Sequence, residues 1–61
     1  MERNKKYESY KITVWFGSPV RRETLKGAQA FADRMEKKGK HGTVEGVWFD
    51  DQIHFDLLRK F

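Results

Sequence analysis

The sequence predicts a small α+β domain in which one helix packs on one face of a three- to four-stranded, mainly antiparallel sheet. Between Thr24 and Gly39, apolar residues recur at three- and four-residue spacing, which is typical of an amphipathic helix. On either side of that segment, apolar and polar residues alternate, which is typical of strands with one buried face. Because 61 residues suffice for one domain only, we assign residues 1–61 to a single domain.

The chain is predicted to begin with a flexible basic arm over residues 1–7, because this stretch is polar and charged and lacks periodicity. A strand follows over residues 9–16, where apolar side chains occupy every second position. The set expected to face the helix is Tyr10, Ile12, Val14 and Phe16. Trp15 is then expected on the opposite face, beside Lys11 and Thr13.

Glycine and proline in residues 17–19 predict a turn, and the following residues 20–24 have two interpretations. They can form a short edge strand that makes a hairpin with the first strand, or a loop that leads into the helix. Neither alternate set of positions in this segment is apolar, so a strand here is expected at the edge of the sheet. Arg21 and Arg22 are then exposed to solvent.

The helix is expected to begin after Thr24, whose hydroxyl can accept a hydrogen bond from a free backbone N–H of the first turn. It is expected to end at Gly39, which can adopt a left-handed conformation. The predicted buried stripe consists of Leu25, Ala28, Phe31, Ala32 and Met35. Basic residues then cluster over residues 37–42. They complement the negative end of the helix dipole, and they can also form a basic tip for phosphate groups.

Two further strands are predicted over residues 43–49 and 52–57, around a two-residue turn at Asp50–Asp51. Since directly paired residues share a face, this register places one apolar set toward the helix, with Phe55 over Gly46. That set is Val44, Trp48, Ile53, Phe55 and Leu57; the other face then holds Glu45, Val47, Phe49, Gln52, His54 and Asp56. A three-residue loop would instead pair Phe49 with Ile53 and Val47 with Phe55, and would turn Trp48 outward. A helix over residues 51–60 is the third interpretation.

Composition bounds the class of protein. The absence of cysteine excludes a disulfide framework and a thiolate zinc site. The sequence has no signal-peptide pattern and no apolar run long enough to span a membrane, so we expect a complete cytoplasmic gene product. The formal net charge is +4, with basic residues over 21–40 and acidic ones over 43–58. Nine aromatic residues exceed what one thin core can bury, so some are expected at the surface.

The residue types favour a binding protein over an enzyme. No cysteine nucleophile is present, and neither serine lies in a nucleophile motif. His54 and Asp56 share a face of the predicted strand and could meet, as a general base and its partner would. The two histidines lack the spacing of metal ligands, and the glycines form no phosphate-binding motif. We therefore expect no catalytic residue, no metal and no cofactor.

An uncovered sheet face with aromatic and basic residues favours nucleic-acid binding, in which rings stack on bases and cations follow the backbone. The residues predicted to bind are Lys11, Trp15, Arg21, Arg22, Lys37, Lys38, Lys40 and Phe49. The alternative is a small protein-binding regulator or inhibitor, of the kind that phages and mobile elements encode, which would use the same aromatic surface. A homodimer could also cover the open face. No membrane association is expected.

Residues 10–35 resemble the amino-terminal arm-binding domain of phage-type integrases. In both, a strand and a glycine turn lead to a basic strand and then to an alanine-rich helix with an aromatic residue. The matching positions are Tyr10, Gly17, Arg21, Arg22, Thr24, Ala28, Ala30 and Phe31. The likeness covers less than half of the chain, and in that family the full sheet precedes the helix. It implies a sheet that reads DNA.

Overall fold

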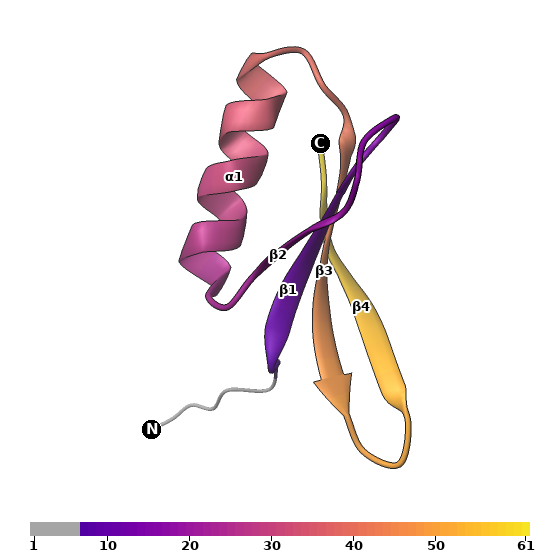
Figure 1. The fold of residues 1–61 in the computed structure, drawn as a ribbon. Helices are drawn as coiled ribbons and strands as arrows, with labels where there is room; N and C mark the ends of the chain where they lie inside the picture. Colours follow the sequence, from indigo (N-terminus) through magenta and orange to yellow (C-terminus); the bar gives the residue numbers. More distant parts are fainter. Residues whose placement is uncertain (1–6) are drawn as a thin grey trace.

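The computed structural model describes residues 7–61 and contains one helix and four strands (Figure 1). In chain order the elements are β1 (Ser9–Val14), β2 (Val20–Arg22), α1 (Leu25–Lys37), β3 (Gly42–Phe49) and β4 (Ile53–Lys60). The predicted α+β class is confirmed, with four strands rather than three. Residues 20–22 form a short strand, and residues 53–60 form a strand rather than a helix.

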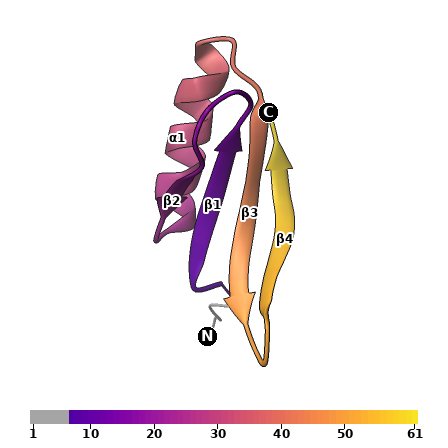
Figure 2. The same ribbon diagram turned by 45° about the vertical axis from the view of Figure 1, so that its right-hand side comes forward.

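The strands form one antiparallel sheet in the order β2-β1-β3-β4. Helix α1 lies on one face of this sheet and packs against β1, β2 and β3. Strand β4 lies at the edge away from the helix, and the opposite face of the sheet carries no layer of residues 7–61 (Figures 1 and 2). The described part of the chain is therefore a two-layer structure with one uncovered sheet face.

The helix begins and ends where the sequence predicts. The Thr24 hydroxyl accepts a hydrogen bond from the Gly27 N–H at 3.0 Å and satisfies one free donor of the first turn. At the other end, Gly39 adopts a left-handed φ of 80°, and the Lys40 N–H donates to the Met35 carbonyl at 3.0 Å. These contacts reverse the chain and deliver it to the start of β3.

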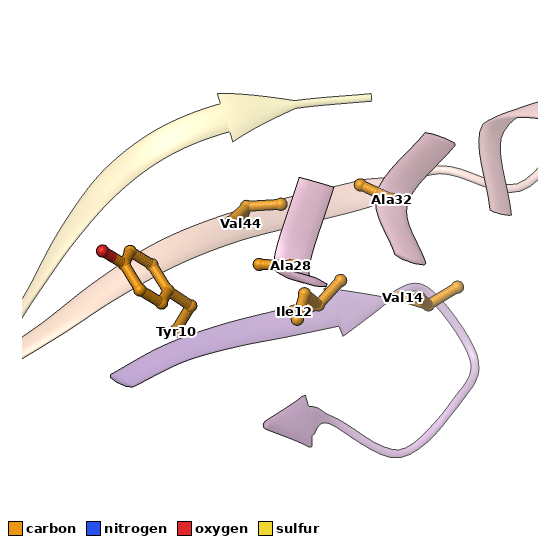
Figure 3. Packing of buried hydrophobic residues seen from close by; sticks show 6 residues of the cluster. All are labelled: Tyr10, Ile12, Val14, Ala28, Ala32 and Val44. Atoms are coloured by element: carbon orange, nitrogen blue, oxygen red, sulfur yellow. The ribbon is translucent and has the colours of Figure 1, made fainter. Parts of the chain in front are cut away.

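The core is a single small cluster between the helix and the sheet (Figure 3). It contains Tyr10, Ile12 and Val14 from β1, Ala28 and Ala32 from α1, and Val44 from β3. The alanines let the helix approach the sheet closely, and the largest fully buried side chains are Ile12 and Val44. Phe16, which was predicted to face the helix, is fully exposed. The prediction is wrong there because β1 ends at Val14 and Phe16 adopts a left-handed φ of 66° in the following turn.

The register of β3 and β4 differs from the preferred prediction. Phe49 pairs with Ile53, so the connection has three residues, as in the alternative register. The Asp50 side chain accepts a hydrogen bond from the Gln52 N–H at 2.9 Å, and this bond stabilises the longer turn. Since one residue of slip reverses every side chain, Ile53, Phe55 and Leu57 lie on the uncovered face rather than under the helix.

Gly46 is covered by Tyr7 and not by Phe55. In the observed register Gly46 pairs with Asp56, and Phe55 pairs with Val47 on the opposite face. The Tyr7 ring lies over Gly46, packs edge-on against Tyr10 at 5.8 Å between centroids, and donates its hydroxyl to Asp56 at 3.0 Å. Tyr7 was predicted to belong to the flexible arm and is instead part of the fold. The rest of that predicted arm, residues 1–6, lies outside the described residues.

Candidate functional site: an aromatic–basic end and an open sheet face

One end of the molecule combines exposed aromatic rings with cations. At this end the loop after β1 meets the loop that joins α1 to β3. The backbone N–H of Trp15 donates to the backbone carbonyl of His41 at 2.9 Å, and the centroids of the Trp15 and His41 rings are 5.4 Å apart. We call this region the aromatic–basic end and define it by Trp15, Phe16, Lys37, Lys38, Lys40 and His41.

Local backbone structure presents the two rings of the aromatic–basic end to solvent. The Gly17 N–H donates to the Val14 carbonyl at 3.0 Å, which closes a tight turn directly after β1. Phe16 stands in that turn in a left-handed conformation, which costs a non-glycine residue free energy. Trp15 is 59% exposed and Phe16 107%. Phe16 is strained and exposed and contributes nothing to the core, so its position in the turn favours a role in contacting a partner.

A hollow of about 450 Å³ lies beside these rings. Its walls come from the turn after β1, from Phe31 and Met35 of the helix, and from Gly39, Lys40 and His41. Its volume falls within the roughly 300–1,000 Å³ that is usual for ligand sites. The hollow therefore combines an apolar wall with the ammonium group of Lys40.

The lysines at this end are not neutralised by the nearest acidic residues. Arg59 of β4 binds Asp33 at 2.8 Å and Glu36 at 3.0 Å, and these contacts, the hydrogen bond to Asp33 first, raise the Arg59 pKa. Within residues 7–61, Lys37, Lys38 and Lys40 form no salt bridge. Arg59 thus occupies the two carboxylates of the helix and leaves the three lysines available to an anion.

The second surface is the sheet face opposite the helix, which we call the open face and define by Lys11, Val47, Phe49, Ile53, Phe55 and Leu57. Cross-strand pairing places these residues on one side of β1, β3 and β4. Val47 is buried at its centre, while its four other apolar side chains are 46–55% exposed. The Lys11 ammonium lies 5.1 Å from the Phe55 ring centroid, a cation–π contact. A depression of about 280 Å³ runs from these residues to Pro19 and Arg21.

The structure divides the eight predicted binding residues between these surfaces. Four lie at the aromatic–basic end: Trp15, Lys37, Lys38 and Lys40. Three lie on or beside the open face: Lys11, Arg21 and Phe49. The eighth, Arg22, lies over the Phe31 ring at 5.2 Å and belongs to neither group.

Sequence reasoning missed several exposed residues. Phe16 was placed in the core because its alternation with Val14 continues past the end of the strand. Ile53, Phe55 and Leu57 were placed under the helix by the two-residue turn. The three-residue alternative gave the observed pairing but turned Trp48 outward, whereas Trp48 lies on the same side of β3 as the buried Val44. His41 carried no sequence pattern beyond its basic neighbours.

The histidine considered for catalysis has a different partner from the one expected. His54 binds Asp50 at 2.9 Å and stacks on Trp48 with centroids 4.1 Å apart, whereas Asp56 accepts a hydrogen bond from Tyr7. The three-residue turn brings Asp50 back beside His54. The Gln52 N–H and, after it, His54 lower the Asp50 pKa. This exposed pair stabilises a turn.

Among residues 7–61, no group of three acidic, histidine or cysteine side chains could hold a metal ion. No helix in that range is long and apolar enough to cross a membrane. Comparisons with protein families, with curated proteins and with solved structures found no match. The likeness to integrase arm-binding domains therefore rests on the residues quoted above, and β3 and β4 follow the helix, unlike the order in that family.

Proposed function

We propose that this protein binds single-stranded nucleic acid with its aromatic–basic end. The observation that carries the proposal is the position of Trp15 and Phe16, two exposed rings that line a hollow together with Lys40, close in the chain to Lys37 and Lys38. Exposed aromatic rings can stack on the unpaired bases of a nucleic acid of any sequence, because every base has a π face. Cations beside them follow the phosphates.

The arrangement of charge supports the same function. Lys37 is the last residue of the helix and Lys38 is its C-cap. Lys40 follows in the loop that contacts the turn after β1, where Trp15 lies. Their positive charge adds to the attraction for a polyanion because their carboxylate neighbours are bound to Arg59. On the open face Lys11 lies opposite a carboxylate, Glu45, and most of the side chains are apolar, so this face fits the contact with nucleic acid less well.

The test is a titration of labelled 12-nucleotide homopyrimidine DNA and RNA against the protein at several salt concentrations. For single strands, the logarithm of the affinity falls with the logarithm of salt by about 0.7 per phosphate neutralised. Three lysines therefore predict a slope of roughly −2. Replacing Lys38 or Lys40 with glutamine should reduce the slope by about 0.7, whereas Lys26→Gln, the same charge change at the other end of the helix, should leave it nearly unchanged.

The aromatic contribution is tested by Trp15→Ala. Loss of one stacked base should weaken binding by roughly 5- to 150-fold, and Trp15→Phe should retain most of the affinity. Phe49→Ala on the open face is the matched control and should bind as the wild type does. Equal affinity of the wild type and Trp15→Ala would overturn the proposal. Absence of salt-dependent binding would overturn it too, and would favour the protein-binding alternative.

A further inference from the structure

The open face carries large apolar side chains that do not belong to the core. Phe49, Ile53, Phe55 and Leu57 each expose about half of a large side chain. Together they offer about 400 Å² of apolar surface, taking roughly 200 Å² for a full side chain. A standard interface buries about 800 Å² on each partner, of which a little over half is non-polar. The open face therefore has the apolar area of a specific interface.

The two ends of the sheet, taken along the strand direction, carry side chains of opposite charge. The β3–β4 turn at one end carries Asp50 and Asp51. At the other end, Lys60 pairs with Thr43 on the open face side, next to the loop of Lys40. Figure 1 shows this turn and the carboxyl end of the helix at opposite ends of the molecule.

From these features we infer that the partner of the open face is a second copy of this chain, packed face to face with its strands antiparallel to those of the first. A two-fold axis near Phe55, lying in the interface and perpendicular to the strands, places β4 over β4 of the other copy. Asp51 lies four residues before Phe55 and Lys60 lies five after it, one of which is the bulge residue between Leu57 and Arg59. The same axis therefore brings Asp51 of each copy over Lys60 of the other.

The charges select this arrangement over the other symmetric one. An axis parallel to the strands would bring the two acidic turns together and the two basic ends together. Face-packed sheets are about 10 Å apart, so charged side chains that point from one sheet toward the other approach within the Debye length of about 8 Å at physiological salt, and the sign of these contacts matters. The antiparallel pair buries the apolar side chains and places unlike charges at both ends. The hollow of the aromatic–basic end is lined by Phe31 and Met35, on the helix side of the sheet and away from this interface, so the inference does not rest on the nucleic-acid proposal.

The test is sedimentation equilibrium of the protein without nucleic acid over a range of concentrations. We expect a reversible dimer. Asp51→Lys should weaken the dimer roughly tenfold, because two contacts per dimer become repulsive, and the effect should shrink in high salt. The combination Asp51→Lys with Lys60→Asp should restore the affinity. Lys26→Asp, a charge reversal on the exposed helix, should leave it unchanged.

Leu57→Ser tests the apolar part of the interface and should give a monomer whose circular dichroism matches that of the wild type. Asp51 and Lys60 are exposed, so the charge exchange tests the inference even if Leu57→Ser fails to fold. A wild type that sediments as a monomer at every concentration would overturn the inference, and a separate protein seated on the open face would then be the better explanation. A charge exchange that does not restore affinity would overturn the antiparallel arrangement.

Discussion

Gly46→Ala should destabilise the protein through its contact with Tyr7. A Cβ atom at position 46 would lie 2.5–2.7 Å from three atoms of the Tyr7 ring, where ordinary contact begins at 3.4 Å. The ring would have to retreat by about 0.9 Å, the difference between those limits. That movement would disturb its packing on Tyr10 and its hydrogen bond to Asp56.

The expected cost follows from these contacts. Overpacking of this kind typically costs about 1–3 kcal/mol, and the hydrogen bond contributes about 1 kcal/mol of that. We therefore expect the free energy of unfolding to fall by about 2 kcal/mol. In a domain of this length, the melting temperature should fall by about 8–16 °C.

The assay is urea and thermal unfolding followed by circular dichroism, at one protein concentration so that association does not change the comparison. Gly17→Ala is the matched control: its Cβ would meet Val14 at 3.5–4.0 Å, which is ordinary contact, so its effect should be small. In a Tyr7→Ala background the obstacle is absent, and Gly46→Ala should then cost little. An equal cost of the alanine with and without the Tyr7 ring would refute the reasoning.

Three further outcomes are expected from unfolding measurements. Ile12→Ala removes a fully buried side chain and should cost about 2–5 kcal/mol by urea denaturation, enough to leave much of the protein unfolded. Arg59→Ala should cost at most about 1 kcal/mol at low salt and less in 1 M salt, because both carboxylates that it binds are more than half exposed. The pKa of Asp50 is below its usual 3.8 in the folded protein, so its stabilising effect is present above that pH and is lost as the pH falls through the folded value. Asp50→Asn should therefore flatten the dependence of the urea midpoint on pH in the acid range.

Local patterns in the sequence were enough to predict the helix, the first strand and the class of fold. Thr24 and Gly39 set the helix limits through contacts within a few residues, which sequence reasoning can evaluate. The alternation of apolar and polar residues in β1 is also a local pattern, and it correctly identified Tyr10, Ile12 and Val14 as core residues. The four exposed lysine and tryptophan residues of the aromatic–basic end were named as binding residues, although nothing in the sequence indicated that Trp15 lies at the same end as the three lysines.

The tertiary structure decided which side chains of β4 lie on the helix side of the sheet and which lie on the open face. The turn at Asp50 can close with two residues or three, and the choice depends on a side-chain hydrogen bond to Gln52 and on the fit of β4 against β3. One residue of slip moved Ile53, Phe55 and Leu57 from the expected core to the open face. The cover over Gly46 came from Tyr7, which is 39 positions away in the chain and is brought there by the pairing of β1 with β3. Contacts of this range depend on the whole packed sheet, so the sequence determined the elements, and the packing of the sheet determined which of their side chains a partner can reach.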